Sequence, residues 1–413
     1  MSTIQAAIDA APNDGTPYYI FIKKGEYQGH VQINRANTHL VGQDKQNTII
    51  WDNKANDDDG GVDKAATINV TGKDVTFDNL TIRNTRTDKQ AVALYSNADR
   101  IVITNCNLEG YQDTYRTGNK DVYRHLIRNS KISGRTDFIS GTSEAFFDSD
   151  TLNIVASGGW LVAPAHESGA KYGYVFRDAV ITAKTPGLTT YLGRPWKEKP
   201  IVSFINTHLT EGVDIYPAGW SDMGGLPIQM AECNTMDKGG NAIDLSQRKT
   251  TFTAEGKNCT SKAILGKVEA DSYQLDYMLR GNDNWDADWQ AFILPAPTMS
   301  KSGTTLSWTD ETGFATSFLV IKNGVATITT DTSCEYSDDI TVQSISAFGV
   351  TGEMAKASEV TAISTITTSG AAVAKRQYFT ADGRQVNRLQ HGVTIIRETL
   401  TDNTTRTVKV ISK

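Results

Sequence analysis

Six segments of the chain share one pattern of hydrophobic and polar positions. In each segment Phe or Ile is followed by any residue, then by Asn, Asp or Ser, then by two variable residues, and last by Ile or Leu. Short β-rich segments that carry a polar turn residue at a fixed phase are typical of a parallel β-solenoid, in which each coil stacks its strands on the coil before it. A β-sandwich with irregular strands is the alternative, but sandwiches do not usually repeat one motif in phase so often. The segments begin at Phe77, Ile103, Ile127, Phe147, Phe176 and Phe204, so successive starts lie 26, 24, 20, 29 and 28 residues apart.

The repeat fades after about residue 225, and a different pattern follows. Residues 237–295 mix polar loops with short helical candidates such as Ser272–Leu279, and a break comes at Leu294-Pro295-Ala296-Pro297. Beyond the break, strand-like alternation flanks an Asn323-Gly324 hairpin signal. These patterns predict an all-β chain: a parallel β-helix over residues 1–293, a small β-sandwich over 294–370 and a short β-rich segment over 371–413. The strand-like segments of the predicted sandwich are Leu306–Trp308, Phe318–Ile321 and Ile340–Ile345.

Composition and charge exclude several classes of function. The net charge of −6 argues against nucleic acid as a partner, although one local basic groove would suffice for an acidic polysaccharide. No run of 18 apolar residues occurs, so no membrane span is expected. The four cysteines form no CxxC pair and the six histidines show no HxxxH spacing, so we expect neither a metal nor another cofactor. Pairing of Cys233 with Cys259 stays open.

Two aspartates occupy equivalent places in the repeat. Asp113 lies ten residues after Ile103, and Asp137 lies ten residues after Ile127. The same offset on adjacent coils would stack their side chains about 4.8 Å apart, the spacing of neighbouring strands. Two carboxylates at that distance cannot both ionise freely, so one becomes an acid beside an ionised base or nucleophile. A pair of turn aspartates on a solvated rim is the alternative.

The residues around this pair favour the catalytic reading, because they resemble the signatures of the pectin methylesterase family (carbohydrate esterase family 8), in the family's order. The resemblance covers roughly residues 3–290 and implies a right-handed parallel β-helix. No GxSxG motif occurs, so a serine esterase is not expected. The matching segments are Gln90–Leu94, Gly110–Thr114, Asp137–Gly141 and Leu192–Trp196, with weaker matches at Thr3–Pro12 and Pro217–Trp220.

By this resemblance, Asp137 would be the nucleophile that attacks the ester carbonyl of a methylated galacturonate. Asp113 would protonate the leaving methanol and then activate water to hydrolyse the acyl-enzyme. Gln112 and Gln90 would donate amide N–H groups to the tetrahedral oxyanion. Arg194 would hold Asp137 ionised through a charge-assisted bond. Gln112 and Asp113 are neighbours and would face opposite sides of a straight strand, so we predict a bend there.

The expected substrate surface is less typical of the family than the catalytic groups. Trp196 would give a sugar ring an apolar face, and we expect Tyr115, Tyr111 and Phe138 beside it, although Tyr111 fits the core equally well. Ser140 stands where the family usually has an aromatic residue. In addition, the early Gly-x-Tyr-x-Glu motif lacks its Glu, and the 24 residues from Asp113 to Asp137 are a few more than the family pattern implies.

Other readings remain open at this point. A β-helix glycoside hydrolase on the same polymer also suits a close carboxylate pair, and a lapsed enzyme that only binds pectin is a third possibility. The segments after residue 293 resemble a fibronectin type III domain and then the sorting domains of secreted Bacteroidetes proteins. We therefore expect a secreted or cell-surface monomer that acts on methyl-esterified polygalacturonate (pectin), with surface attachment through the last segment. The given sequence opens directly on a helical pattern, and we expect no signal peptide within it.

Overall fold

The computed structural model describes residues 3–167, 169–360, 373–380, 384–389, 392–401 and 405–412. The chain divides into two compact units, Met1–Val360 and Thr361–Lys413. The larger unit begins with helix α1 (Ile4–Asp9), which Thr3 caps by accepting a hydrogen bond from the Ala6 N–H. The opening helical pattern is therefore confirmed.

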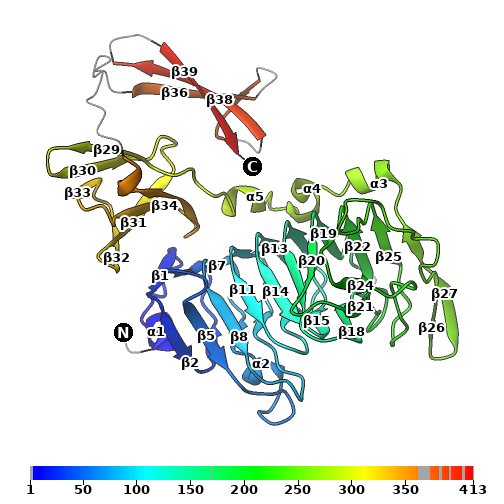
Figure 1. The fold of residues 1–413 in the computed structure, drawn as a ribbon. Coiled ribbons are helices and arrows are strands. Elements are labelled where there is room, and N and C mark those ends of the chain that lie inside the picture. Colours follow the sequence, from blue (N-terminus) through cyan, green and yellow to red (C-terminus); the bar gives the residue numbers. More distant parts are fainter. Residues whose placement is uncertain are drawn as a thin grey trace. The chain divides into compact units, whose positions relative to one another are not determined.

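After this helix the chain winds into coils that stack along one axis, from β1 to β28 (Figure 1). Each complete coil contributes one strand to each of three parallel sheets. The first sheet contains β1 (Tyr18–Ile22), β4 (Thr38–Gly42), β7 (Val75–Asp78), β10 (Ile101–Thr104), β13 (Arg124–Arg128), β16 (Glu144–Asp148), β19 (Tyr174–Arg177), β22 (Ile201–Ile205), β25 (Gln229–Cys233) and β28 (Lys262–Ile264). The second contains β2 (Gly25–Gln28), β5 (Thr48–Asp52), β8 (Thr81–Asn84), β11 (Asn107–Glu109), β14 (Lys131–Gly134), β17 (Thr151–Ile154), β20 (Val180–Ala183) and β23 (His208–Leu209). The third contains β3 (Val31–Ile33), β6 (Ile68–Val70), β9 (Leu94–Ser96), β12 (Tyr115–Thr117), β15 (Thr136–Gly141), β18 (Gly159–Pro164), β21 (Leu188–Gly193) and β24 (Val213–Ile215). The predicted right-handed parallel β-helix is confirmed.

The six repeat starts form one continuous column in the first sheet. In register they pair Phe77 with Ile103, Ile103 with Ile127, Ile127 with Phe147, Phe147 with Phe176, and Phe176 with Phe204. All six side chains are fully buried. The rings of Phe147 and Phe176 stack at 4.2 Å between centroids, and those of Phe176 and Phe204 at 4.3 Å. The sequence repeat is thus the hydrophobic spine of the β-helix.

The third position of each repeat forms a turn with left-handed backbone. These residues are Asn79, Asn105, Asn129, Ser149, Asp178 and Asn206, and their φ angles lie between 49° and 58°. Short polar side chains tolerate this conformation because they can hydrogen-bond locally. The amide of Asn206 donates to Asp178 and that of Asn234 donates to Asn206, each at 2.9 Å, so successive turns are linked between coils.

Replacing Asn206 by Ala should lower the free energy of unfolding by about 1–2 kcal/mol, because Ala is strained at this φ and loses both ladder bonds. Urea denaturation measures the loss. Asn206→Gly, which keeps the left-handed backbone without strain, should lose less. Equal losses in the two variants would show that backbone conformation is not the cause.

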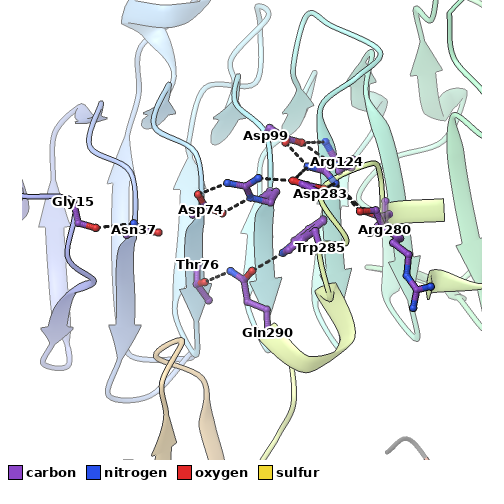
Figure 2. Close-up of polar contacts among 12 residues, drawn as sticks. Gly15, Asn37, Asp74, Thr76, Asp99, Arg124, Arg280, Asp283, Trp285 and Gln290 are labelled. Atoms are coloured by element: carbon purple, nitrogen blue, oxygen red, sulfur yellow. Dashed lines mark hydrogen bonds and ion pairs between the residues drawn. The ribbon is translucent and has the colours of Figure 1, made fainter. Parts of the chain in front are cut away.

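Beyond the last coil the chain returns along the outside of the first sheet (Figures 1 and 2). This return segment carries α3 (Lys267–Asp271), α4 (Leu275–Leu279) and α5 (Ala287–Gln290). Asp283 accepts hydrogen bonds from Arg124, and Gln290 donates to the Thr76 hydroxyl at 3.0 Å (Figure 2). Buried apolar residues such as Leu279 pack against the outward side chains of the sheet. The helical candidate within Ser272–Leu279 is confirmed as α4.

The segment after Leu294 forms two small antiparallel sheets that share the core of Leu306, Trp308, Phe318 and their neighbours. Thr351 donates to the Asp78 carboxylate through its N–H at 3.0 Å and its hydroxyl at 2.6 Å, which attaches these sheets to the β-helix. The predicted strands in this region are confirmed; its likeness to fibronectin type III stays a prediction. The strands are β29 (Thr298–Ser302), β30 (Thr305–Thr309) and β33 (Ser333–Glu335) in one sheet, and β31 (Ala315–Lys322), β32 (Val325–Thr329), β34 (Thr341–Ser346) and β35 (Thr351–Lys356) in the other.

The described residues of the smaller unit form one antiparallel sheet of four strands. The larger unit also contains a short helix, a β-hairpin and a 3-10 helix. No helix among the described residues is long and apolar enough to cross a membrane. Cys233 and Cys259 are both free, as are the other two cysteines. The remaining elements are α2 (Val62–Ala65), β26 (Thr251–Ala254), β27 (Lys257–Thr260), the 3-10 helix η1 (Ala357–Glu359), β36 (Val373–Thr380), β37 (Gln385–Val386), β38 (Gly392–Leu400) and β39 (Thr405–Ser412).

Candidate active site

The residues singled out by sequence lie on or beside the strands of the third sheet. Side chains alternate along its strands, so one set faces the core and the next faces outward. The inward set is fully buried, and its outward neighbours pair with one another in register. The inward residues are Leu94, Tyr115, Ile139 and Val162, and the outward ones are Tyr95, Arg116, Ser140 and Ala163.

Asp113 and Asp137 occupy the same position on adjacent coils. A bridge between Gln112 and Thr136 precedes them, and the Tyr115–Ile139 pair follows them. Each aspartate is 4% exposed and has left-handed backbone, with φ of 57° and 49°. A left-handed residue breaks the alternation of a strand. The equal phase of the two aspartates and the bend at Gln112-Asp113 are therefore both confirmed.

The surroundings of Asp113 favour its protonated form. Burial raises the pKa of Asp113 to about 6, and the negative charge of Asp137 acts in the same direction. The amide of Gln90 opposes this shift by donating to the Asp113 carboxylate. The side-chain amide of Asn56 in turn donates to Oε1 of Gln90 at 2.9 Å, which fixes the orientation of the Gln90 amide. Asp113 is thus a carboxyl group in a fixed orientation that can carry a proton near pH 6.

Asp137 has a cationic partner instead. Arg194 donates to its two carboxylate oxygens at 2.9 Å and 2.6 Å in a bidentate pair. Burial raises the pKa of Asp137, and the hydrogen bonds and charge of Arg194 oppose that effect. The guanidinium of Arg194 also lies over the Trp160 ring, 3.6 Å from its centroid. Bidentate, stacked geometry of this kind holds a carboxylate ionised and in one orientation.

Sequence reasoning missed an aromatic row beside this ion pair. Trp160 and Tyr191 are register partners on β18 and β21, with nearly parallel rings 6.0 Å apart. Tyr216 continues the row at 4.4 Å from Tyr191. All three side chains are half-buried, so part of each ring surface is accessible. Tyr191 directly precedes the Leu192–Trp196 motif, and this proximity is the signal that could have identified it.

The remaining predicted residues fall into two groups. Trp196, Gln112 and Tyr111 are half-buried, and the Gln112 amide forms no hydrogen bond to any part of the chain that the structure describes. Tyr115 and Phe138 are corrections: both are completely buried in the β-helix core and cannot contact a substrate. The Tyr115 hydroxyl is hydrogen-bonded to Nδ1 of His125 at 3.0 Å, deep inside the coil. Among the described residues, no cluster of His, Cys, Asp or Glu could hold a metal ion.

Comparison with known sequences gives one consistent result. The family profile described as Pectinesterase matches residues 1–250. A pectinesterase of Petunia integrifolia is 32% identical over 304 residues, which cover 68% of this chain and 77% of the Petunia protein. A probable pectinesterase A of Aspergillus niger is 28% identical and is covered to 86% of its length. By contrast, the chain spans only 43% of an Arabidopsis thaliana protein described as a probable pectinesterase/pectinesterase inhibitor.

Comparison with solved structures also finds pectin methylesterases. The pectin methylesterase from carrot has a TM-score of 0.58 and 25% identity, with 68% of this chain and 90% of the carrot chain covered. The enzyme from Erwinia chrysanthemi has a TM-score of 0.56 over 69% of this chain and 94% of its own, and at 24% identity it supports the fold alone. A pectin methylesterase solved in complex with a hexasaccharide is 26% identical with a TM-score of 0.53, and the match covers 70% of this chain and 94% of that one.

Proposed function

The chain belongs to the pectinesterase family, and on this premise we propose that it removes methyl esters from homogalacturonan by a two-step mechanism that uses two aspartates. The observation that carries the proposal is the contrast between two adjacent buried carboxyl groups. Arg194 keeps Asp137 ionised, whereas burial and the neighbouring charge favour the proton on Asp113. Such a pair provides a nucleophile and an acid in one site.

In the first step a carboxylate oxygen of Asp137 attacks the carbonyl carbon of the methyl ester. The resulting oxyanion accepts a hydrogen bond from the Gln112 amide, which has no competing partner among the described residues. Collapse of the tetrahedral intermediate breaks the bond from carbon to the methoxy oxygen. Asp113 gives its proton to that oxygen, and methanol leaves. The product is an acyl-enzyme in which Asp137 and the galacturonate share an anhydride bond.

In the second step Asp113 is ionised and acts as the base. It takes a proton from water, and the hydroxide oxygen attacks the carbonyl carbon of the anhydride. Release of Asp137 breaks the anhydride and leaves a galacturonic acid, which loses its own proton to the solvent and becomes the free carboxylate. Asp113 again holds a proton, so the site is ready for another ester. The bond between Gln90 and Asp113 keeps this group in place throughout.

The test is to incubate methylated pectin with the protein and to measure methanol and new reducing ends in the same samples. We expect methanol release without chain shortening. New reducing ends without methanol would instead support a retaining glycoside hydrolase, which also uses two close carboxyl groups. No change in either quantity would support a protein that only binds pectin.

The rate should depend on the proton of Asp113. Since its pKa is about 6 and the free enzyme needs it protonated, kcat/KM should fall as pH rises above about 6. At lower pH, kcat/KM should fall again as Asp137 gains a proton, and burial places this limb above the ordinary range for aspartate. Initial rates of methanol release across the pH range provide the profile. A rate that keeps rising through neutral pH would contradict the role given to Asp113.

Replacing Gln112 by Ala should lower kcat for methanol release by about 10²–10³-fold, because one donor to the oxyanion is lost. KM should change little, since the oxyanion exists only after attack. Gln28→Ala, which removes an exposed amide from β2, is the matched control and should leave kcat unchanged. If Gln112→Ala changed KM and left kcat unchanged, this side chain would bind the substrate in its ground state and would not stabilise the oxyanion.

Export is also part of the proposal, because the polymer substrate lies outside the cell that makes the enzyme. We also propose a monomeric state. The resemblance of the last segment to sorting domains supports attachment at the cell surface. Protein found in the cytoplasm of the native host with its tail intact would count against export.

A further inference from the structure

The loop of residues 53–61, between β5 and α2, is joined to the catalytic pair through one side chain. The amide of Asn56 donates to Oε1 of Gln90 at 2.9 Å, and the amide of Gln90 donates to the Asp113 carboxylate. Asn56, Gln90 and Asp113 therefore form a chain of two hydrogen bonds that ends on the acid. The two-step mechanism uses the second of these bonds and assigns no task to the first.

The backbone holds Asn56 against Gln90 as well. The N–H of Asn56 donates to the main-chain carbonyl oxygen of Gln90 at 3.0 Å, so the two residues are joined at two points. The loop also closes on itself, because the Gly61 N–H donates to the Asn56 carbonyl oxygen at 3.0 Å and the Ala55 N–H donates to the Asp59 carboxylate at 2.9 Å. Ala55 is completely buried. The loop is thus a fixed support for Asn56.

Further contacts join this loop to the segment that leads to Gln90. Asp58 forms ion pairs with Arg86, at 2.8 Å, and with Lys89. The side-chain amide of Asn84 donates to the carbonyl oxygen of Lys54 at 3.0 Å. These contacts lie on both sides of residue 56 in the sequence, so the loop cannot move away from the segment without breaking them.

A glutamine amide has two ends of opposite character, and the end that faces Asp113 decides which form of the carboxyl group is stabilised. The carbonyl oxygen would accept the proton of Asp113 and stabilise the protonated form. The amino group donates to the ionised carboxylate and stabilises that form instead. Because the Asn56 amide already donates to Oε1 of Gln90, the amino group is the end that remains for Asp113.

Other groups that act on Asp113 come from β12 and β15. Burial raises the pKa of Asp113 most, and the charge of Asp137 acts in the same direction, whereas the Ser140 hydroxyl, the Gln90 amide and the charge of Arg116 lower this pKa. Gln90 differs from the charged groups, because its effect reverses when its side-chain amide turns over. A residue that prevents this reversal therefore controls the acid.

We propose that Asn56 is a positioning residue: by holding Oε1 of Gln90, it keeps the amino group of Gln90 on Asp113. Asp113 can then give its proton to the leaving methanol and remain ionised as the base of the second step. This inference rests on the proposed function and adds a residue that takes no part in bond making. Since Asn56 acts through Gln90, its effect must disappear when Gln90 is replaced.

The experiment replaces Asn56 by Leu, which has a similar shape and no donor, and by Asp, which can only accept a hydrogen bond from Gln90 when ionised. Asn53→Asp is the matched control, because Asn53 is exposed on the same loop and the substitution adds the same charge. Asn56→Leu is also combined with Gln90→Leu. One readout is the pH profile of kcat/KM for methanol release. The other is the pKa of Asp113, followed by NMR of isotope-labelled aspartate carboxyl carbons and assigned with Asp113→Asn. Thermal unfolding checks that every variant is folded.

We expect both Asn56 variants to raise the pKa of Asp113 from about 6 to about 7, the effect of losing one hydrogen bond to the charged form. The upper limb of the kcat/KM profile should move to higher pH by the same amount, because the free enzyme needs Asp113 protonated. Asn56→Asp should have the larger effect, since its carboxylate attracts the amino group of Gln90 away from Asp113. Asn53→Asp should change neither quantity. In the protein that carries Gln90→Leu, Asn56→Leu should cause no further change.

An unchanged pKa of Asp113 together with an unchanged upper limb in both Asn56 variants would overturn the inference. An equal effect of Asn56→Leu with and without Gln90→Leu would also overturn it, as would a lower unfolding temperature as the only change. These outcomes are separate from failure of the proposed function. If the wild-type protein released no methanol while Asn56→Leu still raised the pKa of Asp113, the esterase assignment would fail and the positioning role would stand.

Discussion

Replacing Asp137 by Asn should lower kcat for methanol release by about 10⁴-fold or more, the scale seen when a catalytic nucleophile is removed. Asparagine has nearly the shape of aspartate but has no carboxylate oxygen that can attack the ester carbonyl. The variant also leaves Arg194 without its bidentate partner. The side chain of Arg194 is partly exposed, so water can solvate the unpaired charge and the protein should remain folded.

The control for this experiment is Asp148→Asn. Asp148 also forms an ion pair with an arginine, Arg128, at 2.7 Å, but this pair lies on the first sheet. Asp148→Asn removes a comparable ion pair but should leave methanol release unchanged. Circular dichroism and thermal unfolding of both variants separate loss of chemistry from loss of structure. Unchanged methanol release by folded Asp137→Asn would show that another group is the nucleophile.

Replacing Phe176 by Ala should lower the free energy of unfolding of the larger unit by about 3–5 kcal/mol. The Phe176 ring is fully buried between the rings of Phe147 and Phe204, which stack on it at 4.2 Å and 4.3 Å. Truncation removes both stacking contacts and leaves a cavity in a column that the rigid coils cannot close. Urea denaturation followed by far-UV circular dichroism measures the change.

Tyr277→Ala is the matched control for this substitution. Tyr277 lies on α4 and is 73% exposed, so its truncation should change the free energy of unfolding by less than about 0.5 kcal/mol. If Phe176→Ala were as stable as Tyr277→Ala, the aromatic column would not be the stabilising core of the β-helix.

The features that recur in the sequence were predictable. A phase shared by six segments predicted the register of the first sheet, because equivalent apolar positions align when coils stack. The same offset placed Asp113 beside Asp137. The bend between Gln112 and Asp113 was predictable because neighbours on a straight strand face opposite sides, so both can reach one site only where the strand bends. The left-handed φ of Asp113 provides this bend.

Features that arise from one coil meeting a distant segment were not predictable. The sequence predicts Tyr115 and Phe138 as aromatic substrate surface, yet strand alternation and the bend direct both into the core. The contact of Thr351 with Asp78 and the bond of Gln290 to Thr76 join segments more than 200 residues apart, and no local pattern indicates them. Trp160 lies in no repeat, so only the register with Tyr191 identifies it.

The central claim is that Asp113 and Asp137 act as one catalytic unit on a methyl ester. The most direct test is to measure kcat for methanol release by Asp113→Asn, by Asp137→Asn and by the double variant. Groups that act as a unit show strongly non-additive losses. We predict that each single variant is severely impaired and that the double variant is no slower than the slower single one. Losses that multiply in the double variant, or a single variant with wild-type kcat, would contradict the claim.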